Sequence, residues 1–139
     1  MAVIVKPCFN CEHPINMYVG QQVFGTNLGL GWYKSYSCPY CGYEIEEDGN
    51  DTTPDEIQKA VLDQEGTWLL DIEETGERAI FVVKILRKAL NLSVHDAIKI
   101  KKSMPGKAIE GTKFEMNRLK QLLERQGFQS STIKIPKPK

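Results

Sequence analysis

The feature that most constrains this chain is a set of cysteines arranged as two Cys-x-x-Cys pairs. Cys8 and Cys11 form the first pair, and Cys38 and Cys41 form the second pair after 26 intervening residues. The chain contains 4 cysteines, so the two pairs use every thiol. Two residues between the thiols of a pair let both sulfur atoms reach one ion, and two pairs supply the four thiolates of a tetrahedral site. The spacing therefore predicts one structural zinc ion (Zn2+), with no coordination position left for water or substrate.

Redox chemistry and disulfide bonds are the alternative uses of these thiols. A redox pair usually lies at the start of a helix, whereas both pairs here lie in segments rich in Pro, Gly, Asn and Tyr. Disulfides need an oxidising compartment, and the first residues lack the pattern of a signal peptide. We therefore expect a metal site in a cytoplasmic protein. His13 follows Cys11 closely enough to replace a thiolate, but four sulfurs already satisfy the metal, so a surface histidine is expected.

The segment that contains the cysteines, residues 1–50, resembles a zinc ribbon. In such a small β-rich domain, metal ligation supplies much of the folding free energy. Alternating and aromatic stretches predict short strands over residues 17–24 and 32–37, with a glycine-rich turn over 25–31 between them. Aromatic side chains gather in the same segment, and we expect them to form its small core rather than to stack on bases. They are Trp32, Tyr33, Tyr36, Tyr40 and Tyr43.

Charge divides the chain into two halves of opposite sign. Residues 1–65 hold three basic and ten acidic side chains, a balance of −7, and residues 66–139 hold fifteen basic and eight acidic ones, a balance of +7. Such an asymmetry favours two modules with different roles. The basic half could meet nucleic acid or an acidic protein, whereas the acidic half suits a phosphate backbone poorly. No apolar run approaches the roughly 20 residues that span a bilayer, so no membrane role is expected.

The second half of the chain has a regular pattern of strands and helices. A helix that begins near Thr53 and ends at Gly66 is expected to link the modules, over residues 51–66. Strands are predicted over 68–72, 107–110 and 128–135, and helices over 79–90, 93–102 and 112–126. Residues 136–139 form a basic tail. The predicted fold class is α+β, a small zinc ribbon followed by a β-α-α-β-α-β two-layer domain over residues 67–135.

Several short motifs in this half are typical of one family. They are Thr75-Gly76-Glu77, Val83-Lys84, Leu86-Arg87, Glu110-Gly111 and Leu122-Leu123-Glu124, followed by Gly127. With this element order, residues 68–134 resemble the C-terminal domain of the bacterial ribosomal stalk protein (L-seven/L-twelve). That resemblance implies a non-enzymatic domain that docks on translational GTPases through its first two helices. The contact positions it implies are Ile80, Val83, Lys84, Arg87, Ser93 and Val94.

The chain also departs from that family. Ala79 and Ile98 stand where lysines are typical, Asn91-Leu92-Ser93 replaces a glycine-rich entry to the second helix, and a zinc ribbon stands in place of the dimerisation domain. We therefore expect a protein that is not itself a ribosomal stalk protein. The residue pattern, taken without the resemblance, also indicates a contact surface on the same helix. One stripe of this helix suits packing on the sheet, and Ile80, Val83, Lys84 and Arg87 form a second stripe beside it. This second stripe either meets a partner or packs against the ribbon of the same chain.

Catalysis is not expected from this sequence. It lacks a phosphate-binding Gly-x-x-x-x-Gly-Lys motif and a Gly-x-Ser-x-Gly elbow, and its thiols are committed to metal. Two other non-enzymatic functions remain open beside docking on a translation factor. One is an immunity protein or antitoxin that neutralises a toxin by direct binding. The other is an accessory protein that binds RNA or the ribosome through lysines such as Lys99, Lys101, Lys102 and Lys107.

Overall fold

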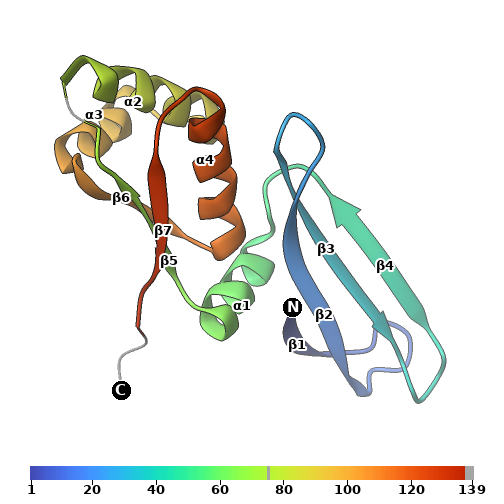
Figure 1. Cartoon of the computed structure of the whole chain (residues 1–139). Coiled ribbons are helices and arrows are strands. Elements are labelled where there is room, and N and C mark those ends of the chain that lie inside the picture. The colour runs from blue at the N-terminus through green and yellow to red at the C-terminus, as the bar shows by residue number, and fades with distance from the viewer. Residues whose placement is uncertain (75, 137–139) are drawn as a thin grey trace. The chain divides into compact units, whose positions relative to one another are not determined.

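The computed structural model describes residues 1–74 and 76–136, and it shows a mixed α+β chain with two antiparallel sheets (Figure 1). The elements in chain order are β1 (Ala2–Pro7), β2 (Pro14–Phe24), β3 (Gly29–Ser37), β4 (Glu44–Gly49), α1 (Asp55–Glu65), β5 (Trp68–Ile72), α2 (Gly76–Leu90), α3 (Val94–Ser103), β6 (Gly106–Gly111), α4 (Lys113–Arg125) and β7 (Ser130–Lys134). They form two compact units, residues 1–65 and 66–139. The boundary falls where the sign of the charge changes in the sequence.

The first unit is built on an antiparallel sheet whose strands follow one another in the order β1-β2-β3-β4. The two predicted strands correspond to β2 and β3, both of which begin three residues earlier than expected. β1 and β4 were not predicted as strands. The sequence of β4, Glu44-Ile45-Glu46-Glu47-Asp48-Gly49, has low intrinsic strand preference. It forms a strand because it pairs with β3 along its whole length, from Ser37↔Glu44 to Trp32↔Gly49.

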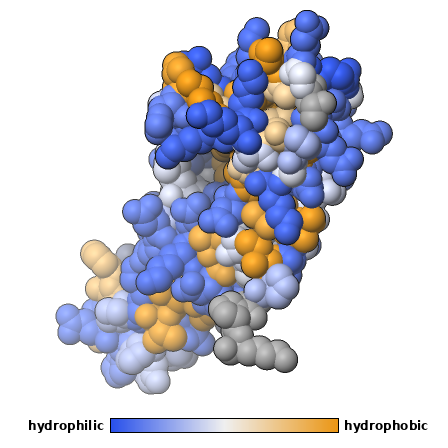
Figure 2. All heavy atoms as spheres, turned by 90° about the vertical axis from the view of Figure 1, so that its left-hand side faces the viewer, coloured by the Kyte–Doolittle hydropathy of each residue, from blue (hydrophilic) through white to orange (hydrophobic). Residues whose placement is uncertain are grey.

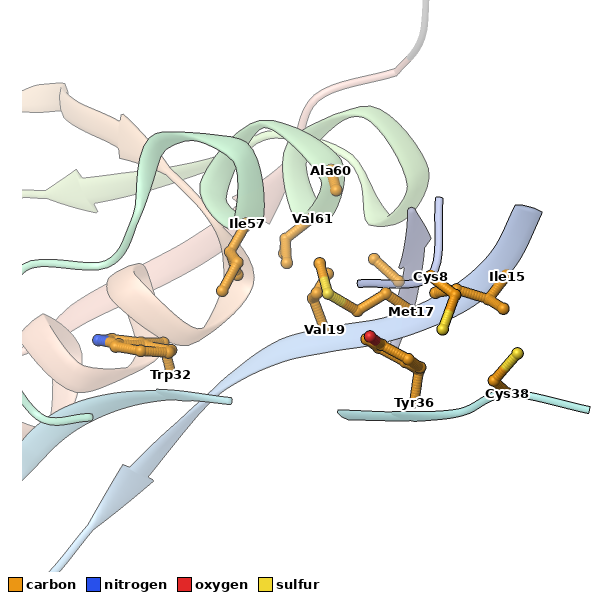
Figure 3. Close-up of a cluster of buried hydrophobic side chains, with 11 residues drawn as sticks. Cys8, Ile15, Met17, Val19, Trp32, Tyr36, Cys38, Ile57, Ala60 and Val61 are labelled. Carbon is orange, nitrogen blue, oxygen red and sulfur yellow. The ribbon is translucent and has the colours of Figure 1, made fainter. Parts of the chain in front are cut away.

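Helix α1 covers one face of this sheet. Ile57, Ala60 and Val61 point from the helix toward strand residues such as Val19, and all of these side chains are buried (Figure 3). The helix also holds the edge of the sheet, because the amide of Gln64 binds both the N–H and the carbonyl group of Val3, at 2.9 and 2.7 Å. The segment that we expected to link the modules is therefore part of the first unit. Its apolar stripe forms a core with the sheet.

The second unit contains the expected order β-α-α-β-α-β, with a sheet in the order β6-β5-β7. Leu70 and Ile72 of the central strand β5 form its core with side chains of α2 and α4. These are Val82, Leu86, Met116, Leu119 and Leu123. The unit therefore has a hydrophobic core of its own, separate from the core that α1 forms with the first sheet.

The ends of the helices in the second unit can be compared with the ends expected from the sequence. α4 begins with a capping box, in which Glu115 N–H donates to Thr112 Oγ1 at 3.1 Å and Thr112 N–H donates to Glu115 Oε1 at 2.8 Å. α2 begins at Gly76, three residues earlier than expected, and Thr75 lies outside the described residues. Of the expected basic tail, only Pro136 lies within the described residues. No helix in the described ranges has the length and apolar character of a membrane-spanning segment.

Candidate metal centre

The cysteines lie in two turns at the same end of the first sheet. Cys8 and Cys11 follow β1, and Cys38 and Cys41 follow β3. Because consecutive strands run in opposite directions, the β1–β2 turn and the β3–β4 turn lie at one end, and the pairing of β2 with β3 holds them together. The hairpin between β2 and β3 lies at the other end. The order of the strands therefore places both Cys-x-x-Cys pairs beside each other.

Both turns have the same backbone structure. Cys8 N–H donates to the carbonyl of His13 at 2.8 Å, and Glu12 N–H donates to the carbonyl of Cys8 at 2.9 Å. Thirty residues later, Cys38 and Gly42 make the equivalent bonds at 2.8 and 2.9 Å. The fifth residue of each turn has a positive φ, 67° at Glu12 and 78° at Gly42. This conformation closes each turn and brings its two thiols to the same side.

The four sulfur atoms form a compact group. Cys8 Sγ lies 3.7 Å from Cys41 Sγ, Cys11 Sγ lies 3.5 Å from Cys38 Sγ, and all four lie within 4.8 Å of one another. A tetrahedron with metal–sulfur bonds of about 2.3 Å has edges of about 3.8 Å, so the group has the size of a four-thiolate metal site. All four cysteines are free thiols. They could therefore hold one metal ion, and their chemistry suits zinc.

The surroundings of the thiols make some of them much easier to ionise than others. Burial opposes ionisation of Cys8, but N–H groups of Cys11 and Asn10 and the neighbouring thiols together lower its pKa to about 6. The side chain of Asn10 and the N–H of Tyr43 lower the pKa of Cys41. The N–H of His13 favours the thiolate of Cys11, but burial and the other thiols outweigh it and raise the pKa of Cys11 to about 12. A cation at the centre of the group favours the ionised form of each thiol that it contacts, so it offsets the repulsion between neighbouring thiolates.

His13 lies beside the thiols on the exposed surface. Its Nδ1 is 3.3 Å from Cys11 Sγ, and its ring stacks on Tyr40 with 4.2 Å between ring centroids. The four cysteine sulfur atoms lie close enough together to bind one metal ion. In that arrangement, His13 contacts a ligand of the metal and is not itself a ligand. Such a neighbour orients and polarises the ligand that it contacts.

The aromatic residues divide into core and surface positions. Trp32 and Tyr36 are buried in the core of the first unit, as predicted, and Tyr36 Oη accepts a hydrogen bond from Phe9 N–H at 3.1 Å. The prediction was wrong for Tyr40 and Tyr43, which are 63% and 37% exposed. Tyr40 lies in the metal-binding turn, and Tyr43 lies at the end of that turn, with its ring centroid 6.3 Å from that of the core residue Tyr36. Tyr33 is half-buried. Side chains alternate along a strand, so Tyr33 lies on the face of the sheet opposite to that of its neighbour Trp32.

The predicted partner-binding residues lie on α2, α3 and the turn between them. Ile80, Lys84, Arg87 and Val94 are exposed, and Val83 is half-buried. Ser93 has a structural role at the start of α3, since its Oγ accepts a hydrogen bond from Asp96 N–H at 3.1 Å.

The same helices expose two further apolar side chains that we did not predict as contact positions. These are Phe81 and Ile98, with exposed fractions of 55% and 47%. The spacing Val94–Ile98, one helical turn, was the sequence signal for the second of them.

Comparisons with protein-family models, with curated proteins and with solved structures found no match to this chain. The resemblance of the second unit to the stalk-protein domain therefore rests on the residue motifs and on the order of the elements.

Proposed function

We propose that this chain is a non-enzymatic protein-binding module whose first unit is stabilised by one Zn²⁺ ion. Four thiolates complete the coordination of a tetrahedral zinc ion, so the metal has no open position at which to activate water or substrate. Ligation in such sites contributes on the order of 10 kcal/mol to folding. The role of the metal is to connect the β1–β2 and β3–β4 turns. Binding of a partner then belongs to surfaces that this scaffold and the second unit present.

The observation that carries the proposal is an exposed apolar and basic surface on α2 and α3. We define this α2–α3 face by Ile80, Phe81, Lys84, Arg87, Val94 and Ile98, all of which are exposed. Its four large apolar side chains lie outside the core of the unit, which is formed by other residues of α2. In the upper part of Figure 2, where these helices lie, groups of apolar side chains interrupt the hydrophilic surface. Exposed apolar groups with a polar rim are typical of protein interfaces.

The charges of the same face favour an acidic protein as the partner. Lys84 Nζ lies 5.5 Å from the centroid of the Phe81 ring, so a cation is held directly beside an apolar anchor. Arg87 Nε donates to the carbonyl of Leu92 at 3.3 Å, which fixes this cation at the end of the same stripe. The family resemblance implies a translational GTPase as the partner. We adopt that class as the most specific form of the proposal.

A binding measurement with matched isoleucine variants tests this proposal. The zinc-loaded chain is titrated against a purified bacterial elongation-factor GTPase, and the dissociation constant is measured by calorimetry. Ile80→Ala is expected to weaken binding by about five-fold or more, because a central apolar anchor contributes more than about 1 kcal/mol. Ile133→Ala is the control, since Ile133 on β7 is 39% exposed and Ile80 is 41% exposed.

Three results would contradict the proposal. The first is equal affinity of the two variants, and the second is the absence of binding. The third is preferential binding of RNA with a steep loss of affinity as salt increases, which would identify the lysines of the second unit as a phosphate-binding surface. The Lys84→Ala variant separates these cases further. It should weaken protein binding by more than a control substitution of Lys59, which lies on α1 in the first unit.

A further inference from the structure

The face of the first sheet opposite α1 is open and carries large apolar side chains. Side chains alternate between the two faces of a strand, and the register pairs Val3 with Tyr18 and Gly20 with Tyr33 on the face away from the helix. Val5, Tyr18 and Phe24 on this face are 69%, 43% and 41% exposed. The aromatic rings lie over glycines, with Tyr33 over Gly20 and Phe24 over Gly29 and Gly31. We call this surface the open sheet face.

Two neighbouring hollows border this face, and each combines an aromatic ring with a carboxylate. The first is lined by Phe24 and Asp48, together with Gln22, Gly31, Trp32, Gly49 and Asn50. The second is lined by Tyr33, Glu46 and Asp48, together with Lys34, Ser35 and Glu47. Asp48 belongs to both. An aromatic ring beside a carboxylate suits a guanidinium or ammonium group, which can contact the ring and pair with the carboxylate.

The charge around the hollows selects a cationic occupant. Glu44, Glu46 and Asp48 alternate along β4 on the open side, and in the described ranges none of them pairs with a basic side chain. Lys34 pairs with Glu47 at 3.3 Å, and Lys6 pairs with Glu56 at 2.7 Å. These three carboxylates are therefore available to a partner. A nucleic-acid backbone would be repelled by the same field.

We propose that the open sheet face binds an extended, arginine-rich or lysine-rich segment of a protein partner. In an extended segment, alternate side chains point to the same side. Basic residues at positions i and i+2 would then enter the two hollows, and the side chain between them would point away from the sheet. Tyr33 and Phe24 contact the cations through their ring faces, and Asp48 and Glu46 pair with them. This site is separate from the α2–α3 face and does not depend on it.

A peptide titration tests this inference on the zinc-loaded full chain. The probe is a fluorescent ten-residue peptide of alternating arginine and serine, and the reference is the same peptide with glutamate in place of arginine. Binding is measured by fluorescence anisotropy at low ionic strength. Asp48→Asn should weaken binding of the arginine peptide about three-fold, and the double variant Asp48→Asn/Glu46→Gln about ten-fold. Glu110→Gln removes one negative charge from the second unit and should leave the affinity unchanged.

A second variant separates loss of the site from loss of the fold. Tyr33→Leu keeps an apolar side chain over Gly20 but removes the aromatic face, so it should weaken peptide binding about three-fold while zinc content and circular dichroism stay unchanged. Equal affinity of Asp48→Asn and Glu110→Gln would overturn the inference. So would the absence of binding at low ionic strength, or tighter binding of a ten-nucleotide single strand than of the arginine peptide. Ile80→Ala should not affect peptide binding, so this inference and the proposed function fail independently.

Discussion

At the scale of single residues, the metal centre depends on two backbone positions as much as on four thiols. Glu12 and Gly42 occupy equivalent places in the two turns, and both have positive φ. This conformation costs an ordinary L-residue roughly 1–2 kcal/mol and costs glycine much less. The second turn therefore meets the requirement with glycine, and the first meets it with a glutamate under strain.

The Gly42→Ala variant should lower the stability of the zinc-loaded first unit. A Cβ on Gly42 would have nothing within 4 Å, so the effect comes from the backbone conformation and not from a clash. We expect a loss of about 1 kcal/mol, measured by thermal unfolding at saturating zinc. Glu12→Gly is the matched variant in the other turn and should not destabilise the unit by a similar amount. Equal destabilisation by both changes would contradict the equivalence of the two turns.

The residue scale is also where sequence reasoning about the site was most successful. The spacing of Cys8, Cys11, Cys38 and Cys41 predicted a single metal-binding group, and the sulfur atoms lie within 4.8 Å of one another. The order of ionisation, with Cys8 low and Cys11 high, was not predictable. It depends on hydrogen bonds from Asn10 and from backbone groups that exist only after both turns have formed.

At the scale of elements, α1 shows the limit of a local pattern. The stripe of Ile57, Ala60 and Val61 predicted a helix at this place, but an amphipathic stripe does not identify the surface that it meets. In the structure it meets the first sheet. β4 shows the opposite case, because its acidic sequence gives no local strand signal and its structure comes from pairing with β3.

Ile57→Ala should destabilise the first unit strongly. Ile57 is completely buried, and removing a buried isoleucine side chain costs about 2–5 kcal/mol. Lys59→Ala changes the exposed side of the same helix and should alter stability by less than about 0.5 kcal/mol. Both are measured by denaturant unfolding of the zinc-loaded chain, with the signal of Trp32 isolated in a Trp68→Phe background. If Ile57→Ala left that transition unchanged, α1 would be a linker after all.

At the scale of the whole molecule, the two units have separate hydrophobic cores and only the first contains the cysteines. Loss of metal should therefore affect them differently. The first unit contains 11 residues of helix in α1, whereas α2, α3 and α4 in the second unit contain 15, 10 and 13. Each unit also has its own tryptophan, Trp32 in the first and Trp68 in the second.

Removal of zinc with a strong chelator should unfold the first unit and leave the second folded. Tryptophan fluorescence of the Trp68→Phe variant should show exposure of Trp32, because ligation supplies on the order of 10 kcal/mol to the folding of such a site. Far-UV circular dichroism should retain the helical signal of the second unit. Readdition of zinc should restore the fluorescence. A first unit that stays folded and metal-free would contradict the structural role of the metal, and simultaneous loss of both signals would contradict the independence of the units.

The sequence by itself determined the features that arise within a few neighbouring residues. These are the Cys-x-x-Cys pairs, the capping box of Thr112 and Glu115, the helical stripes and the opposite charges of the two halves. Only the tertiary structure decided how distant parts of the chain meet. It determines that α1 packs on the first sheet, that β4 is a strand, that Tyr40 and Tyr43 are exposed, and that Asp48 borders two hollows. The physical reason is that spacing and capping act along the chain, whereas strand pairing and burial depend on residues that are distant in sequence and become neighbours only in the folded protein.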